Sequence, residues 1–175
     1  MKKKLKGISL FANVGIAEAY LESIGVDVII ANELDEKRAK FYQHLYPNTE
    51  MIQGDITKDE VFNEIYEKAK VKGIDFIMAT PPCQGMSLAG KQDPLDERNQ
   101  LIYYAIEMIK KLKPRFVFLE NVPQQLKTKI SHNGKKMLIP EYLKEELNEY
   151  YNFNSNPIVD ASDYGVAQKR IRSIF

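Results

Sequence analysis

The chain has one cysteine, Cys83, and it lies in a segment suited to nucleophilic chemistry. It follows the apolar run 74–79, which is typical of a buried strand. Pro81 and Pro82 end that strand because proline has no N–H to donate to a sheet, and Gly85 then permits a turn. A thiol just past the carboxyl end of a parallel strand lies where open α/β sheets bind their ligands. The alternative is an inert buried cysteine, which is what most lone cysteines are.

Glu120 is the second candidate for chemistry, because it directly follows the strand predicted over 115–119. A thiolate is the reactive form of cysteine, and a carboxylic acid can donate a proton to an electrophile that the thiolate attacks. Cys83 and Glu120 therefore predict a covalent nucleophilic scheme. A Cys–His hydrolase is disfavoured, since His44 falls on a predicted helix and His132 in a polar segment where we expect it to be solvated.

The elements that must position these residues alternate between strands and helices along most of the chain. This alternation predicts an α/β fold with a mainly parallel sheet covered by helices on both faces. The predicted strands are 8–12, 26–31, 50–53, 74–79 and 115–119, and the predicted helices are 16–24, 36–45, 57–71 and 100–112, the third with capping-box spacing between Thr57 and Glu60.

The remaining segments are expected to be less regular. Residues 2–6 are predicted as a solvated tail and 124–140 as an exposed, lysine-bearing insertion. A short helix over 141–150, a strand over 151–159 and a loop over 160–169 follow. The chain stops inside a last predicted strand, 170–175, which suggests a truncated or split protein.

The carboxyl ends of the predicted strands carry polar residues in an ordered series. In a doubly wound sheet these ends face one crevice. The turn 13–15 precedes a predicted helix and suits the polar part of a nucleoside cofactor, and Glu33 suits ribose hydroxyls. Asp55 follows the third strand. A single acid at a strand end is usually a solvated loop residue, but five strand ends in order indicate a ligand site. The turn 13–15 lacks the G-x-G-x-x-G pattern, so NAD binding is not indicated.

Length and composition bound the class of protein. The chain has 175 residues, of which 44% are hydrophobic, which suits one soluble globular domain. It contains no apolar run long enough to span a bilayer and no signal peptide, and a single cysteine fits a reducing cytosol, so we expect a cytoplasmic protein without a membrane partner. The net charge of +1 carries no overall signature of nucleic-acid binding. Such a partner would be held by a local patch or by another polypeptide.

Three motifs, in this order, resemble those of the DNA (cytosine-5)-methyltransferases: Pro82-Cys83-Gln84, Glu120-Asn121-Val122, and Gln168 to Arg172. Residues 10–12 and 31–33 are similar to the same family's cofactor motifs, so the resemblance covers 8–175. It implies a class I S-adenosylmethionine-dependent (Rossmann-like) methyltransferase fold with a final antiparallel strand. It also implies S-adenosyl-L-methionine as cofactor, with S-adenosyl-L-homocysteine as product, and double-stranded DNA as substrate in a restriction-modification system. Residues 1–175 would be an incomplete catalytic domain, lacking the target-recognition region, that another part of the enzyme completes.

The resemblance also implies a role for individual residues. Cys83 would attack C6 of cytosine, Glu120 would bind N3 and the exocyclic amine, and Arg172, with Arg170, would hold the O2 edge. No metal is implied. The implied cofactor-binding residues are Phe11, Ala12, Asn13, Gly15, Glu33, Leu34, Asp55, Ile56 and Pro81, with Gly15 leaving room for the cofactor, and the implied DNA contacts are Gln84, Ser87 and Arg98 in a closing loop over 84–99.

The chain departs from the family pattern at three positions. Ser9 replaces an aspartate, and Asn13 and Ile16 replace glycines. Asparagine tolerates left-handed backbone geometry, so the change at Asn13 is mild, whereas Ile16 is bulkier. Two other functions stay open: an RNA (tRNA) cytosine-5 methyltransferase of the same fold, and a non-catalytic subunit of a split enzyme that binds cofactor or a partner chain.

Overall fold

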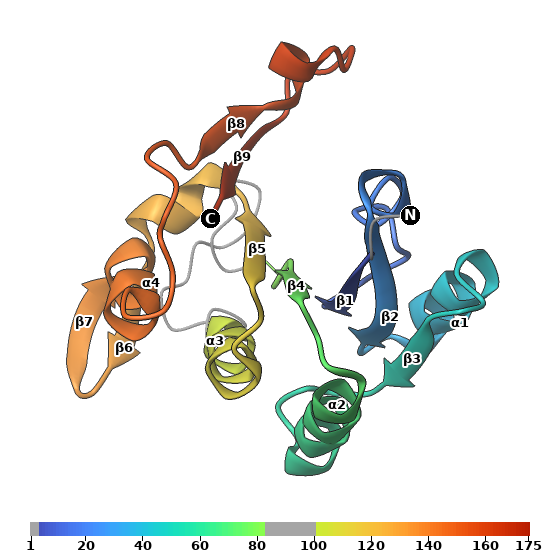
Figure 1. Ribbon diagram of the computed structural model, residues 1–175. Helices are drawn as coiled ribbons and strands as arrows, with labels where there is room; N and C mark the ends of the chain where they lie inside the picture. Colours follow the sequence, from blue (N-terminus) through green and yellow to red (C-terminus); the bar gives the residue numbers. More distant parts are fainter. Residues whose placement is uncertain (1–3, 83–100) are drawn as a thin grey trace. The chain divides into compact units, whose positions relative to one another are not determined.

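The computed structural model describes residues 4–82 and 101–175, drawn in colour in Figure 1. The chain forms two compact units. The N-terminal unit comprises residues 1–80 and 107–118, and the C-terminal unit comprises residues 81–106 and 119–175. Helix α3 (Leu101–Leu112) and strand β5 (Phe116–Asn121) each contribute residues to both units.

The N-terminal unit is built on parallel strands in the order β3-β2-β1-β4. Their bounds are Leu5–Leu10 (β1), Val26–Glu33 (β2), Glu50–Gln53 (β3) and Phe76–Ala79 (β4). The first residues of β5 join this unit through the Phe116 N–H, which donates to the Asp75 carbonyl at 3.0 Å. Ile8, Ile30 and Ile77 are fully buried at its centre. The predicted mainly parallel sheet with helices is confirmed.

Two long helices of this unit lie between successive strands. Helix α1 (Glu36–Leu45) begins after Asp35, whose carboxylate accepts a hydrogen bond from the Arg38 N–H at 2.9 Å. This bond satisfies one of the free N–H groups at the helix start. Helix α2 (Asp59–Lys72) begins after Lys58, with no side-chain cap. The predicted capping box between Thr57 and Glu60 is therefore wrong, because the helix starts two residues after Thr57.

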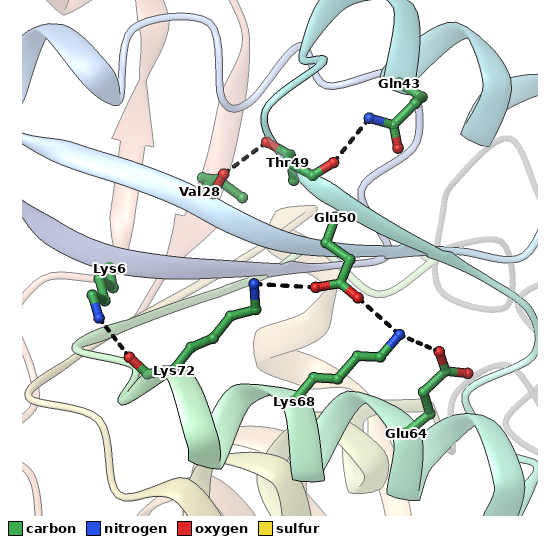
Figure 2. Close-up of polar contacts among 8 residues, drawn as sticks. All are labelled: Lys6, Val28, Gln43, Thr49, Glu50, Glu64, Lys68 and Lys72. Atoms are coloured by element: carbon green, nitrogen blue, oxygen red, sulfur yellow. Dashed lines mark hydrogen bonds and ion pairs between the residues drawn. The ribbon is translucent and has the colours of Figure 1, made fainter.

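Charged side chains fasten α2 to the edge strand β3, as Figure 2 shows. Glu50 on β3 lies 2.8 Å from Lys68 Nζ and 3.1 Å from Lys72 Nζ, both on α2. Lys6 on β1 donates to the Lys72 carbonyl at 2.7 Å, at the end of the same helix.

The predicted solvated tail, residues 2–6, is wrong at its C-terminal end, because strand β1 begins at Leu5.

The segment 16–24 differs from its prediction. It forms turns and a short 3-10 helix, η1 (Glu22–Ile24), instead of a full helix. Ile16 and Tyr20 are each 81% exposed, whereas Glu18 is 4% exposed. A helix in a protein is stabilised mainly by burying its apolar face. Here the acidic residue points inward and the apolar ones outward, so that stabilisation is missing.

In the C-terminal unit the end of β5 pairs with antiparallel strands. Strand β9 (Ile171–Ile174) lies between β5 and β8 (Ile158–Asp160). Glu120 pairs with Ile174, and Asn121 with Ser173. The final antiparallel strand is thus confirmed, whereas only the end of the predicted strand 151–159 forms. A 3-10 turn, η4 (Ala161–Tyr164), interrupts the predicted loop before β9.

The predicted exposed insertion is ordered structure of the C-terminal unit. It forms η3 (Pro123–Lys127), the hairpin β6 (Lys129–His132) and β7 (Lys135–Leu138), and the start of α4 (Ile139–Leu147). Ile130 is 5% exposed and Ile139 is fully buried. His132 is not solvated as predicted, because its Nε2 lies 3.0 Å from the Glu146 carboxylate and its side chain is 18% exposed.

Candidate active site

The turn after β1 is the first part of the candidate site, and it has an unusual backbone. Phe11, Asn13 and Gly15 have φ values of 60°, 52° and 81°. Positive φ is rare for residues other than glycine, and such strain concentrates at functional sites. Asn13 is left-handed, a geometry that asparagine tolerates better than most residues. The Ala12 N–H donates to the Asn32 carbonyl at 2.9 Å, and Thr80 Oγ1 donates to the Phe11 carbonyl at 3.1 Å, so both neighbouring strands hold this turn.

Glu33, at the end of β2, holds a carboxylate in a fixed orientation beside this turn. Its Oε2 accepts from the Asn13 N–H at 2.8 Å, and its Oε1 accepts from the Asp35 N–H at 2.9 Å. The residue is 7% exposed. An ionised carboxylate offers about four acceptor positions. About two therefore remain for further donors, such as a pair of neighbouring hydroxyl groups.

The end of β3 is brought to the end of β2 by backbone and amide hydrogen bonds. Asn32, 2% exposed, donates from Nδ2 to the Ile52 carbonyl at 2.9 Å and to the Gly54 carbonyl at 3.1 Å. The Gly54 N–H donates to the Glu33 carbonyl at 2.9 Å. Asp55 follows directly and accepts from the Thr57 N–H at 2.9 Å. Sequence reasoning missed the positioning role of Asn32, although an amide inside an apolar strand was a usable signal.

The other implied cofactor residues of the N-terminal unit differ in exposure. Ala12 and Ile56 are buried, Phe11 is half-buried and Leu34 is 63% exposed. Gly15 is buried, and its expected role of leaving room for the cofactor stays a prediction. A Cβ on Gly15 would lie 2.3 Å from a ring carbon of Tyr46, so the space beside Gly15 is filled by that tyrosine.

In the C-terminal unit, Glu120 and Arg172 form an ion pair. Arg172 Nε lies 2.8 Å from Glu120 Oε1, and both side chains are partly exposed. They come from the paired strands β5 and β9, which explains why two residues 52 positions apart meet. Arg170 is exposed, and its N–H donates to Asp160 Oδ1 at 3.0 Å. Of the two predicted arginines, the structure therefore brings Arg172 to the acid.

Asn121, next to Glu120, holds the chain that leads to the cysteine. Its Nδ2 donates to the Pro81 carbonyl at 3.1 Å, and the residue is 2% exposed. Ser173 Oγ, fully buried on β9, lies 3.3 Å from the Asn121 carbonyl and 3.1 Å from Gln125 Oε1. Pro81 is thus fixed beside the strand end that carries Glu120.

Four predicted site residues lie outside the described residues: Cys83, Gln84, Ser87 and Arg98. Over 4–82 and 101–175, no group of three or more His, Cys, Asp or Glu side chains is arranged to hold a metal ion. No helix in the same ranges has the length and apolar character needed to cross a membrane.

Comparison with known proteins decides the family. A family model described as C-5 cytosine-specific DNA methylase matches residues 5–175. The chain belongs to this family. The resemblance seen in the motifs around Cys83, Glu120 and Arg172 is thereby confirmed at the level of the family.

Its relatives include type II methyltransferases. The chain is 45% identical over 179 residues to type II methyltransferase M1.HgaI of Avibacterium volantium, covering 99% of this chain and 50% of that protein. It is 34% identical to M.HhaI of Haemophilus parahaemolyticus, covering 96% and 47%. The chain therefore spans about half the length of these curated relatives.

Solved structures agree with this placement. A prophage-encoded DNA modification methyltransferase of E. coli superposes with a TM-score of 0.77 at 28% identity, covering 98% of this chain and 46% of that one. Dnmt2 methyltransferase of S. pombe superposes with a TM-score of 0.65 at 14% identity, covering 98% and 48%, and supports the fold alone. The methyltransferase fold expected from the motifs is confirmed.

Proposed function

We propose that this chain is the catalytic part of an enzyme that methylates C5 of cytosine in double-stranded DNA, within a restriction-modification system. The observation that carries this proposal is the ion pair between Glu120 and Arg172 at 2.8 Å, next to the hydrogen bond from Asn121 to Pro81. Family membership and the type II methyltransferases among the relatives support it.

The three catalytic residues would act on different atoms of the base. Cys83 would add its thiolate to C6, forming an S–C6 bond. Glu120 would hydrogen-bond N3 and the exocyclic amine, and Arg172 would hold Glu120 in place and contact the O2 edge. Addition at C6 makes C5 enamine-like and able to accept a methyl group; loss of the C5 proton and of the thiolate then restores the aromatic ring.

Chain connectivity supports the participation of Cys83. The carbonyl of Pro81, two residues earlier, accepts a hydrogen bond from Asn121 Nδ2. Two residues of chain span at most about 7 Å. The short chain between Pro81 and Cys83 therefore supports a shared role for Cys83 and Glu120. C6 of a stacked base is out of reach, so the target would be flipped out of the duplex, which costs a few kcal/mol.

The methyl donor would be S-adenosyl-L-methionine, which supplies an electrophilic methyl group when bound. The N-terminal unit fits such a ligand, because Glu33 is held by two backbone donors and keeps acceptor capacity for ribose hydroxyls. Asp55 at the neighbouring strand end would accept from the adenine amine. Ile56 and Phe11 would contact the ring.

DNA recognition would require further polypeptide. The chain carries a net charge of only +1, whereas contacts to phosphate usually dominate affinity for DNA. The type II relatives are about twice as long as the matched region. We expect Gln84, Ser87 and Arg98 to contact DNA, with base reading supplied by a target-recognition region elsewhere.

The test is labelled methyl transfer to duplex DNA and to tRNA. The 175-residue chain alone should give incorporation near background, and adding the second half of a type II relative in trans should raise incorporation into DNA. Transfer to tRNA would favour the RNA enzyme. Tight cofactor binding with no transfer to either, even after complementation, would favour a non-catalytic subunit. Robust sequence-specific methylation by the chain alone would contradict the proposed division of roles.

A further inference from the structure

The turn 11–15 is hydrogen-bonded to Asn32 and Thr80 at the ends of the neighbouring strands. One further hydrogen bond reaches it from the end of helix α1. Tyr46 Oη donates to the Gly15 carbonyl at 2.6 Å. Tyr46 caps the C-terminal end of α1, where its N–H donates to the Tyr42 carbonyl at 2.8 Å. The carboxyl end of α1 is thereby coupled to the turn.

The same tyrosine also fixes the turn by packing. A Cβ on Gly15 would lie 2.3 Å from the Tyr46 ring and 3.0 Å from the Tyr42 ring. The ring centroids of Tyr42 and Tyr46 are 4.8 Å apart. Tyr42 is fully buried in a cluster with Ala12 and Ala31. The turn is therefore held at Asn13 by Glu33 and at Gly15 by Tyr46.

We propose that Tyr46 is a positioning residue for the methyl donor: its hydroxyl and ring hold residues 13–15 in the backbone form that binds the cofactor. The inference rests on the proposed function, because it assumes that this turn receives the cofactor. Tyr46 itself touches none of the acids that would bind ribose or adenine among the described contacts. It acts on the cofactor through Gly15.

The surroundings of Tyr46 keep its hydroxyl as a donor. Burial, and then the nearby carboxylate of Glu18, raise the pKa of Tyr46 above its ordinary value. The phenol consequently keeps its proton throughout the physiological pH range. The hydroxyl therefore remains able to donate to the Gly15 carbonyl over that pH range.

The test compares Tyr46→Phe, which removes the hydroxyl and keeps the ring, with Tyr20→Phe, whose side chain is 81% exposed. Amide hydrogen exchange is measured at Asn13 and Gly15, and S-adenosyl-L-homocysteine binding is measured by calorimetry on the same proteins. Loss of one hydrogen bond predicts roughly fivefold faster exchange and roughly fivefold weaker binding for Tyr46→Phe only. The KM for the cofactor should rise in the complemented enzyme while kcat and the KM for DNA stay unchanged.

The outcomes separate the two claims. Suppose that the wild-type chain binds S-adenosyl-L-homocysteine and that Tyr46→Phe binds it equally well. If amide exchange at Asn13 and Gly15 is also unchanged, Tyr46 has no positioning role. If exchange at Asn13 and Gly15 accelerates but the wild-type chain does not bind the product, the proposed cofactor site is wrong and the positioning role falls with it. If Tyr46→Phe lowers global stability, exchange at buried Ile65 on α2 should rise equally with that at Gly15, and this result would also overturn the inference.

Discussion

Replacing Gly15 by alanine should destabilise the N-terminal unit more than the same change at a glycine with open surroundings. Gly15 has φ +81°, and an added Cβ would lie 2.3 Å from the Tyr46 ring. Gly25, at the end of η1, has φ +90° and nothing within 4 Å of the added atom. The two positions therefore share the backbone term and differ in the steric term.

The expected magnitude follows from these two terms. Placing an L-residue in the left-handed region costs about 1–2 kcal/mol. Forcing an extra methyl group into filled space costs about 1–3 kcal/mol more, because the Tyr46 ring or the backbone must shift. Gly25→Ala should thus lower the free energy of unfolding by the first amount alone, and Gly15→Ala by the sum, roughly 2–5 kcal/mol.

Urea unfolding followed by circular dichroism measures both variants against the wild type. The decisive quantity is the gap between Gly15→Ala and Gly25→Ala, which should be about 1–3 kcal/mol. A second expected effect of Gly15→Ala is weaker binding of S-adenosyl-L-homocysteine. Equal losses of stability at the two positions would refute the packing of Tyr46 against Gly15.

Two other variants test the carboxylates of this unit. Glu33→Ala should weaken cofactor binding by about 1.5–3 kcal/mol in calorimetry, the value of a charge-assisted hydrogen bond; unchanged affinity would place the ribose elsewhere. Glu18 is 4% exposed, neither carboxylate oxygen has a hydrogen-bond partner in the described chain, and burial raises its pKa above 4.5. Above pH 4.5 the unfolded state has released this proton while the folded state still holds it. The free energy of unfolding of the wild type should therefore fall by about 1.4 kcal/mol per pH unit relative to that of Glu18→Gln, until the pH reaches the pKa of the folded state. Exposed Glu67→Gln is the control for lost charge, and a pH-independent difference for Glu18→Gln would show that the carboxyl is not buried.

Strands β2 and β4 were predictable because each is a mainly apolar run bounded by turn residues. The failure at 16–24 has a definite cause. Helical spacing of apolar residues was read as a buried face, but Glu18 occupies the inside while Ile16 and Tyr20 face solvent. The spacing of apolar residues cannot reveal that Glu18 is the buried one, because its burial depends on packing against residues distant in the sequence.

The failure at 124–140 has a different cause. Lysine-rich composition predicted exposure, yet Ile130 and Ile139 are buried and His132 pairs with Glu146 on α4. Composition averages over a segment whose lysines are exposed while Ile130 and Ile139 are buried. Which of its residues become buried is decided by tertiary packing.

The candidate site shows the same division between local and long-range information. Glu33 and Glu120 were predictable because each ends an apolar strand, and Arg172 because of its motif. Tyr46 was not predictable, because its partner Gly15 lies 31 residues away. No local pattern marks a tyrosine at a helix end as a contact of a distant turn.

The most direct test of the central claim is covalent trapping on DNA. The enzyme completed in trans is incubated with the methyl donor and a duplex carrying 5-fluorocytosine at the target position, whose C5 cannot lose its substituent as a proton. If Cys83 adds to C6, a protein–DNA adduct resistant to denaturation should accumulate, and Cys83→Ser should abolish it. An equally strong adduct with Cys83→Ser, or no adduct from a wild-type enzyme that methylates ordinary duplex DNA, would contradict the account.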